Sequence, residues 1–138
     1  MTAVYLDTSA AAKLLVEEAE SGALAQYLDQ SDVEAVACLL LETELRRFAV
    51  RHAIPQQEVT AILDSVSLYD MPHSLYYEAG ILPGRHLRSI DALHLIAAVR
   101  LGADVVVTYD NRMQESAADL GLEVLPISTK SPQPGQES

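Results

Sequence analysis

The sequence predicts an α/β fold in which a parallel sheet of four to five strands carries helices on both faces. Two observations favour this fold class. Short apolar segments rich in β-branched and aromatic residues recur along the chain, and helix-length segments separate most of them. Strands that alternate with helices pair in parallel, with the helices packed against the sheet. The 138 residues suffice for one such domain and are too few for two.

The composition is that of a globular protein without a membrane segment. Hydrophobic residues make up 49% of the chain and charged residues 21%. The longest apolar run, residues 35–41, is far below the ~20 residues that span a bilayer. The N-terminus lacks the basic start of a signal peptide. The only cysteine, Cys38, cannot form an internal disulfide. We therefore expect a cytoplasmic protein.

The first half of the chain is expected to contain two strands and four helices. Pro55 separates the last two helices, because the residue before a proline avoids the helical region and a proline readily opens a new helix. The expected strands are residues 3–6 and 33–37, and the expected helices are residues 10–16, 21–28, 39–52 and 56–66.

The second half is expected to begin with a weak strand over residues 67–69 and a helix that runs up to Pro83. A basic loop follows, and Ser89 is the expected N-cap of a helix that Gly102 ends. The remaining expected elements are strands over residues 105–108 and 123–125 and a helix over residues 113–120. We expect the folded domain to span residues 1–127 and the polar tail, residues 128–138, to be disordered.

The helix over residues 89–99 is apolar around almost its whole circumference, which is typical of an interior helix. Asp91 nevertheless lies in its first turn, and an aspartate is rarely buried without a partner. We expect that partner to be a metal ion.

Two further aspartates follow predicted strands. Asp7 follows the first strand and Asp110 the strand over residues 105–108, so both are expected at the carboxyl edge of the sheet, where ligands bind. Three carboxylates at ~4–6 Å repel one another, and Mg²⁺ or Mn²⁺, which take oxygen ligands, relieve that repulsion. The alternatives are a helix cap at Asp7, an Asx turn at Asp110, and attraction of Asp91 to the helix dipole.

Two glutamates compete for a fourth position. Glu42 shares a helix face with Arg46 and is expected to form a surface ion pair. Glu44 lies at the edge of the apolar stripe and is the preferred candidate for the site. An ion pair between Glu44 and Arg47 is the alternative.

These motifs resemble those of PIN-domain ribonucleases, most closely the VapC-like toxins of toxin–antitoxin pairs. The resemblance runs from about residue 3 to residue 126, and it is carried by Leu6–Ala10, Thr43–Leu45, Ser89–Leu95 and Val107–Asp110. It implies a three-layer α/β/α sandwich and endonucleolytic cleavage of RNA. It also implies that four acidic residues bind Mg²⁺ or Mn²⁺, namely Asp7, Glu44, Asp91 and Asp110.

Neighbouring residues are assigned supporting roles. Thr8, Ser9 and Thr108 are expected to orient ligands or contact phosphate, although helix capping also explains the first two. His94 is expected to be a partly buried, hydrogen-bonded histidine, not a general base. Five arginines flank the expected ligands and are candidates for RNA phosphate contacts, with solvated surface charge as the alternative: Arg47, Arg51, Arg85, Arg88 and Arg112.

The net charge of −11 argues against RNA binding through a broad basic surface, but it suits metal-mediated binding or a basic protein partner. The family resemblance implies a cognate antitoxin, seated against the apolar surface of the first two helices, and a homodimer. A catalytically inactive PIN-like binding or regulatory domain is the alternative. A haloacid-dehalogenase-like phosphatase is disfavoured because Ser9 stands where it needs an aspartate, and a receiver domain because it needs a downstream lysine.

Overall fold

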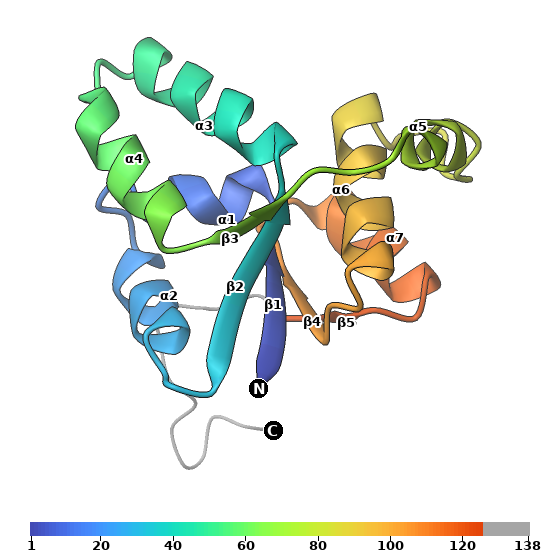
Figure 1. Ribbon diagram of the computed structural model, residues 1–138, viewed down its shortest axis with the longest axis horizontal. Helices are drawn as coiled ribbons and strands as arrows, with labels where there is room; N and C mark the ends of the chain where they lie inside the picture. Colours follow the sequence, from blue (N-terminus) through green and yellow to red (C-terminus); the bar gives the residue numbers. More distant parts are fainter. Residues whose placement is uncertain (126–138) are drawn as a thin grey trace.

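The structure is a computed structural model that describes residues 1–125, and it confirms the predicted parallel sheet (Figure 1). Five strands lie in the order β3-β2-β1-β4-β5, and every neighbouring pair is parallel. The strands are β1 (Thr2–Leu6), β2 (Val33–Cys38), β3 (Ser67–Tyr69), β4 (Val105–Val107) and β5 (Glu123–Val124).

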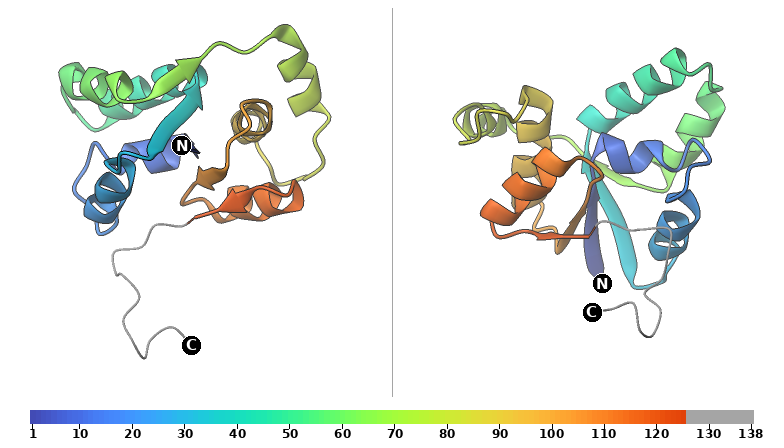
Figure 2. Two further views of the ribbon diagram at one scale, coloured as in Figure 1. Left: turned by 60° about the horizontal axis from the view of Figure 1, so that its bottom comes forward. Right: turned by 180° about the vertical axis from the view of Figure 1, so that it is seen from behind.

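Seven helices within residues 1–125 form the outer layers of the sandwich. Helices α1 to α4 cover one face of the sheet and α5 to α7 the other (Figures 1 and 2). Such a division follows from right-handed crossovers that run outward from β1 in both directions. The helices are α1 (Thr8–Ala12), α2 (Ser21–Leu28), α3 (Leu40–Arg51), α4 (Gln56–Asp64), α5 (His73–Gly80), α6 (Ser89–Arg100) and α7 (Asn111–Asp119). None of these helices is long and apolar enough to cross a membrane.

The centre of the sheet determines where a ligand can bind. Val4 pairs with Val105 and Leu6 with Val107, so β1 and β4 end side by side. The chain leaves β1 toward β2 on one side and reaches β5 from β4 on the other. Strand order therefore reverses between β1 and β4, and the crevice beyond such a switch point is the usual ligand site of an open α/β sheet.

The first helix is shorter than expected. The sequence predicts helix over residues 10–16, but α1 ends at Ala12. The amide nitrogens of Leu14 and Leu15 instead bond to the carbonyls three residues earlier, which tightens the backbone into turns. Lys13 then forms ion pairs with Glu18 and Glu20, two of the three acidic residues of the next loop.

Two expectations about α6 are wrong. Its N-cap is Arg88, while Ser89 is already the first helical residue. The helix is also not buried all round, because Ile90 is 37% and Val99 44% exposed. The predicted end is confirmed, since Gly102 follows the last turn with φ +66°. The predicted disordered tail, residues 128–138, lies outside the described residues.

Candidate active site

A cavity of about 670 Å³ lies at the carboxyl edge of the sheet. All four carboxylates singled out in the sequence line it: Asp7, Glu44, Asp91 and Asp110. They come from four separate elements, namely the end of β1, helix α3, the first turn of α6, and the residues after β4. The fold thus brings together side chains that are up to 103 positions apart in the sequence.

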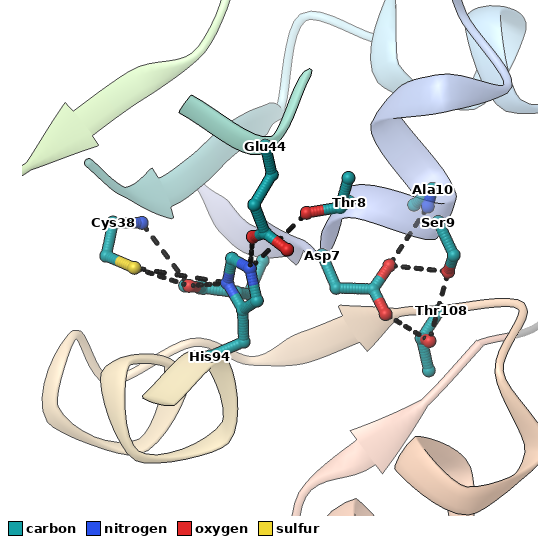
Figure 3. Close-up of polar contacts among 9 residues, drawn as sticks. Asp7, Thr8, Ser9, Ala10, Cys38, Glu44, His94 and Thr108 are labelled. Carbon is teal, nitrogen blue, oxygen red and sulfur yellow. Dashed lines mark hydrogen bonds and ion pairs between the residues drawn. The ribbon is translucent and has the colours of Figure 1, made fainter. Parts of the chain in front are cut away.

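Asp7 is buried, with 4% of its surface exposed. It accepts hydrogen bonds from Ser9 Oγ at 2.7 Å, from the Ala10 amide at 2.9 Å and from Thr108 Oγ1 (Figure 3). Burial raises the pKa of its carboxyl, and these hydrogen bonds offset only part of the rise. Asp7 therefore caps α1 and lines the cavity at once, so the two roles weighed for it are compatible.

Asp110 is the N-cap of α7. Its side chain accepts from the amides of Arg112 at 2.9 Å and Met113 at 3.3 Å, and it lies 3.5 Å from the Arg112 guanidinium. Partial burial raises the pKa of Asp110, but these bonds outweigh it and bring the pKa below its usual value. The cap keeps the carboxylate beside the end of β4.

Asp91 is the third residue of α6. Its Oδ2 accepts from the Arg88 amide at 3.3 Å and lies 3.8 Å from Arg88 Nε. The side chain is partly exposed rather than buried, so the helix does not enclose an unpaired acid as its composition suggested. Asp91 faces the cavity from the loop side.

Glu44 and Glu42 occupy different surroundings on α3. Glu42 makes the predicted ion pair with Arg46, at 3.3 Å, and does not line the cavity. Glu44 lines the cavity and contacts His94, with 2.5 Å between Oε1 and Nε2. Its observed ionic partner is thus His94 of α6 and not Arg47, the alternative considered from the sequence.

His94 is 2% exposed and connects Glu44 to a polar cluster inside the core. Its Nδ1 lies 2.7 Å from the Tyr5 hydroxyl and 3.9 Å from Cys38 Sγ, and its Nε2 lies 3.5 Å from Thr8 Oγ1. Burial disfavours the imidazolium, but hydrogen bonds and charges from Cys38 and Glu44 outweigh it and raise the pKa of His94 to about 10. The same contact with His94 overcomes burial at Cys38 and lowers the pKa of its thiol.

Sequence reasoning missed Tyr5 and Cys38 as neighbours of the site. Tyr5 lies in an expected buried strand and Cys38 directly follows another, and both side chains are buried. The only available signal was that a buried tyrosine hydroxyl and a buried thiol each require a hydrogen-bond partner.

The predicted arginines divide into two groups. Arg88 lines the carboxylate cavity, and Arg85 and Arg112 line an adjacent cavity of about 520 Å³. Arg47 and Arg51 are exposed on α3 and line neither cavity. Arg88 is therefore the one of these five arginines that lines the carboxylate cavity itself.

The donor chemistry of the cavity fits a hard divalent cation, because its acidic residues offer oxygen ligands from four directions. Within residues 1–125, however, no three Asp, Glu, His or Cys side chains form a ready-made metal-binding group. Each of the four carboxylates instead makes a hydrogen bond or ion pair inside the protein. Binding an ion therefore requires them to turn toward one another.

Comparisons with known proteins agree on one family. Residues 4–119 match the family model described as "PIN domain". Ribonuclease VapC35 of Mycobacterium tuberculosis is 36% identical over 129 residues, which cover 88% of this chain and 95% of that protein. The crystal structure of M. tuberculosis VapC20, described as a Sarcin-Ricin loop cleaving toxin, superposes with a TM-score of 0.69 at 16% identity, covering 82% of this chain and 94% of that one. The structure of VapBC-1 from nontypeable Haemophilus influenzae superposes with a TM-score of 0.67 at 18% identity, covering 90% of this chain and 97% of that one.

Proposed function

Because this chain belongs to the PIN-domain family, among the VapC-type proteins, we propose that it is a metal-dependent endoribonuclease and the toxin of a toxin–antitoxin pair. The observation that carries the proposal is the convergence of Asp7, Glu44, Asp91 and Asp110 on one cavity at the switch point of the sheet. The ribonuclease name of its relative VapC35 supports the reaction class.

The four carboxylates would hold Mg²⁺ or Mn²⁺. Such an ion supplies an activated water at neutral pH and neutralises charge on the phosphate and the leaving oxygen. The protein's own part is to keep the donors in place. Ser9 and Thr108 hold Asp7 from two sides, and the α7 amides hold Asp110. These contacts support a positioning role for Ser9 and Thr108, whereas Thr8 contacts His94.

RNA would reach the site along the arginine side of the cavity. Arg88 lies at the carboxylates, and Arg85 and Arg112 lie at the neighbouring cavity, so successive phosphates can meet positive charge there. The net charge of −11 opposes binding elsewhere on the surface. This distribution of charge favours RNA that is bound mainly near the cleaved bond over RNA that is bound along an extended basic face.

A cognate antitoxin and a homodimer complete the proposal. A second cavity, of about 580 Å³, lies away from the carboxylates and is lined partly by Leu14, Leu28 and Ile62. Leu24 is fully buried, while Leu14, Leu15, Tyr27 and Leu28 pack half-buried against the core. The structural neighbours include VapBC proteins, which supports an antitoxin as the partner for this apolar surface. A cytoplasmic location is part of the same proposal.

The test compares two glutamates of one helix. Glu44→Gln removes a proposed ligand, while Glu42→Gln removes an acid outside the cavity and serves as the matched control. With purified protein, RNA and Mn²⁺ or Mg²⁺, we expect Glu44→Gln to lower the cleavage rate by at least ~100-fold. Glu42→Gln retains the rate, and EDTA abolishes it.

Two outcomes would contradict the proposal. Cleavage that survives both Glu44→Gln and Asp91→Asn would show that the carboxylates do not carry the reaction. A folded wild-type protein that cleaves no RNA with either metal, yet binds a neighbour-encoded protein, would instead favour the inactive PIN-like binding domain.

A further inference from the structure

We infer that His94 is a positioning residue that holds Glu44 in place through a permanent Nε2–H donor, with Tyr5 setting the orientation of the imidazole ring. This inference rests on the proposed function, because it concerns how one of the proposed metal ligands is held.

The donor is required by the chemistry of the two groups. A carboxylate only accepts hydrogen bonds, so at 2.5 Å from Glu44 Oε1 the Nε2 atom of His94 must carry the hydrogen. The Tyr5 hydroxyl, 2.7 Å from Nδ1, can either donate or accept. The neutral ring and the imidazolium therefore present the same donor to Glu44, and the arrangement does not depend on which form is present.

The ring is anchored to the sheet. The Tyr5 hydroxyl accepts from the Cys38 amide at 3.3 Å and lies 3.3 Å from Cys38 Sγ, which ties β1 to β2 directly behind the imidazole. The rings of Tyr5 and His94 meet edge to face, with centroids 5.7 Å apart. Tyr5, Cys38 and His94 are each at most 2% exposed, so the Nδ1 side of the ring is shielded from water.

The anchored ring leaves Glu44 able to face the cavity. His94 engages only Oε1, and Figure 3 shows the carboxylate between His94 and Asp7. One oxygen is thus fixed to the protein while the side chain still lines the cavity that Asp7 lines. When a side chain that hydrogen-bonds to a metal ligand is lost, metal affinity or activity typically falls by ~10–100-fold.

The experiment measures the Kd for Mn²⁺ in His94→Gln and His94→Asn. The glutamine amide reaches the place of Nε2 and can donate to Glu44, whereas the asparagine amide reaches only the place of Nδ1. We expect His94→Asn to weaken Mn²⁺ binding by ~10–100-fold and His94→Gln to stay within about threefold of wild type. Equal affinity in both variants, at unchanged folding by circular dichroism, overturns the inference.

A second readout does not depend on the His94 variants and requires no activity. In ¹⁵N-histidine-labelled protein without metal, we expect His94 Nε2 to carry a proton throughout pH 6–8 and its signal to move on Glu44→Gln. An unprotonated Nε2 overturns the inference even if the variants fail to fold. Asp91→Asn separates the two proposals. If wild type and Asp91→Asn bind Mn²⁺ equally, the proposed function fails. If Asp91→Asn loses Mn²⁺ binding while both His94 variants keep it, only the role of His94 is refuted.

Discussion

The buried His94 makes the stability of the protein depend on pH in a defined direction. Its pKa is about 10 in the folded protein and about 6.5 in an unfolded chain. Between these values the folded state binds one more proton than the unfolded state, so stability from this group is fully present below pH 6.5 and is lost as the pH rises toward 10. One proton corresponds to about 1.4 kcal/mol per pH unit, or about 5 kcal/mol over the whole window.

Cys38 partly conceals this effect in the wild type. The pKa of its thiol is lowered by His94, so it loses a proton on folding over part of the same range and its contribution has the opposite sign. Cys38→Ala removes that compensation, but it also removes the hydrogen bond and the charge by which Cys38 raises the pKa of His94, so that only the contact with Glu44 still favours the imidazolium.

The assay is urea unfolding of Cys38→Ala in EDTA at several pH values from 7 to 9. We expect the free energy of unfolding to fall as the pH rises, with a slope below the one-proton limit of about 1.4 kcal/mol per pH unit because the pKa of His94 is lower without Cys38, and the slope to vanish when His94→Gln is added. If the slope persists in the double variant, another group causes it and the proposed protonation of His94 is wrong.

The remaining predictions concern metal binding and the surroundings of Asp7. Mn²⁺ at one hundred times its Kd should stabilise the wild type by about 2.7 kcal/mol, whereas Asp91→Asn should show no shift in thermal unfolding; equal shifts would place the ion elsewhere. Thr108→Val removes a buried donor to Asp7 and should cost about 1–3 kcal/mol in urea unfolding, while a cost near zero would show that the bond contributes nothing. Asp7→Asn should raise metal-free stability at pH 7, because burial raises the pKa of this carboxyl and disfavours its charge; lower stability would contradict that.

Local patterns were enough to predict most strands and their parallel pairing, but not their order in the sheet. The β-branched residues of Val105–Val107 predict a strand. Gly102 predicts a helix end because glycine readily adopts the positive φ that it has in the structure. The end of α1 was not predictable in the same way, because residues 13–16 are good helix formers. In the structure the chain turns here, and Lys13 pairs with acids five and seven positions later, contacts that helical spacing does not predict.

The site was predictable as a set of acids but not as a set of contacts. Strand ends and helix starts identify Asp7, Asp91 and Asp110, since each has a local reason to lie at the edge of the sheet. The partner of Glu44 could not be found, because helical spacing offers only Arg47, whereas His94 lies 50 residues away on the opposite layer. The exposure of Ile90 and Val99 likewise depends on what α6 packs against, which its own sequence does not contain.

The division of the helices between two faces has a mechanical consequence. Asp7 and Glu44 belong to the β1 side of the switch point, and Asp91 and Asp110 belong to the β4 side. The distance between the two pairs of acids therefore depends on the twist between β1 and β4 and on the contact of His94 in α6 with Glu44 in α3. A shear of one half of the sheet against the other would therefore change the distance between the two pairs of acids and with it the width of the cavity.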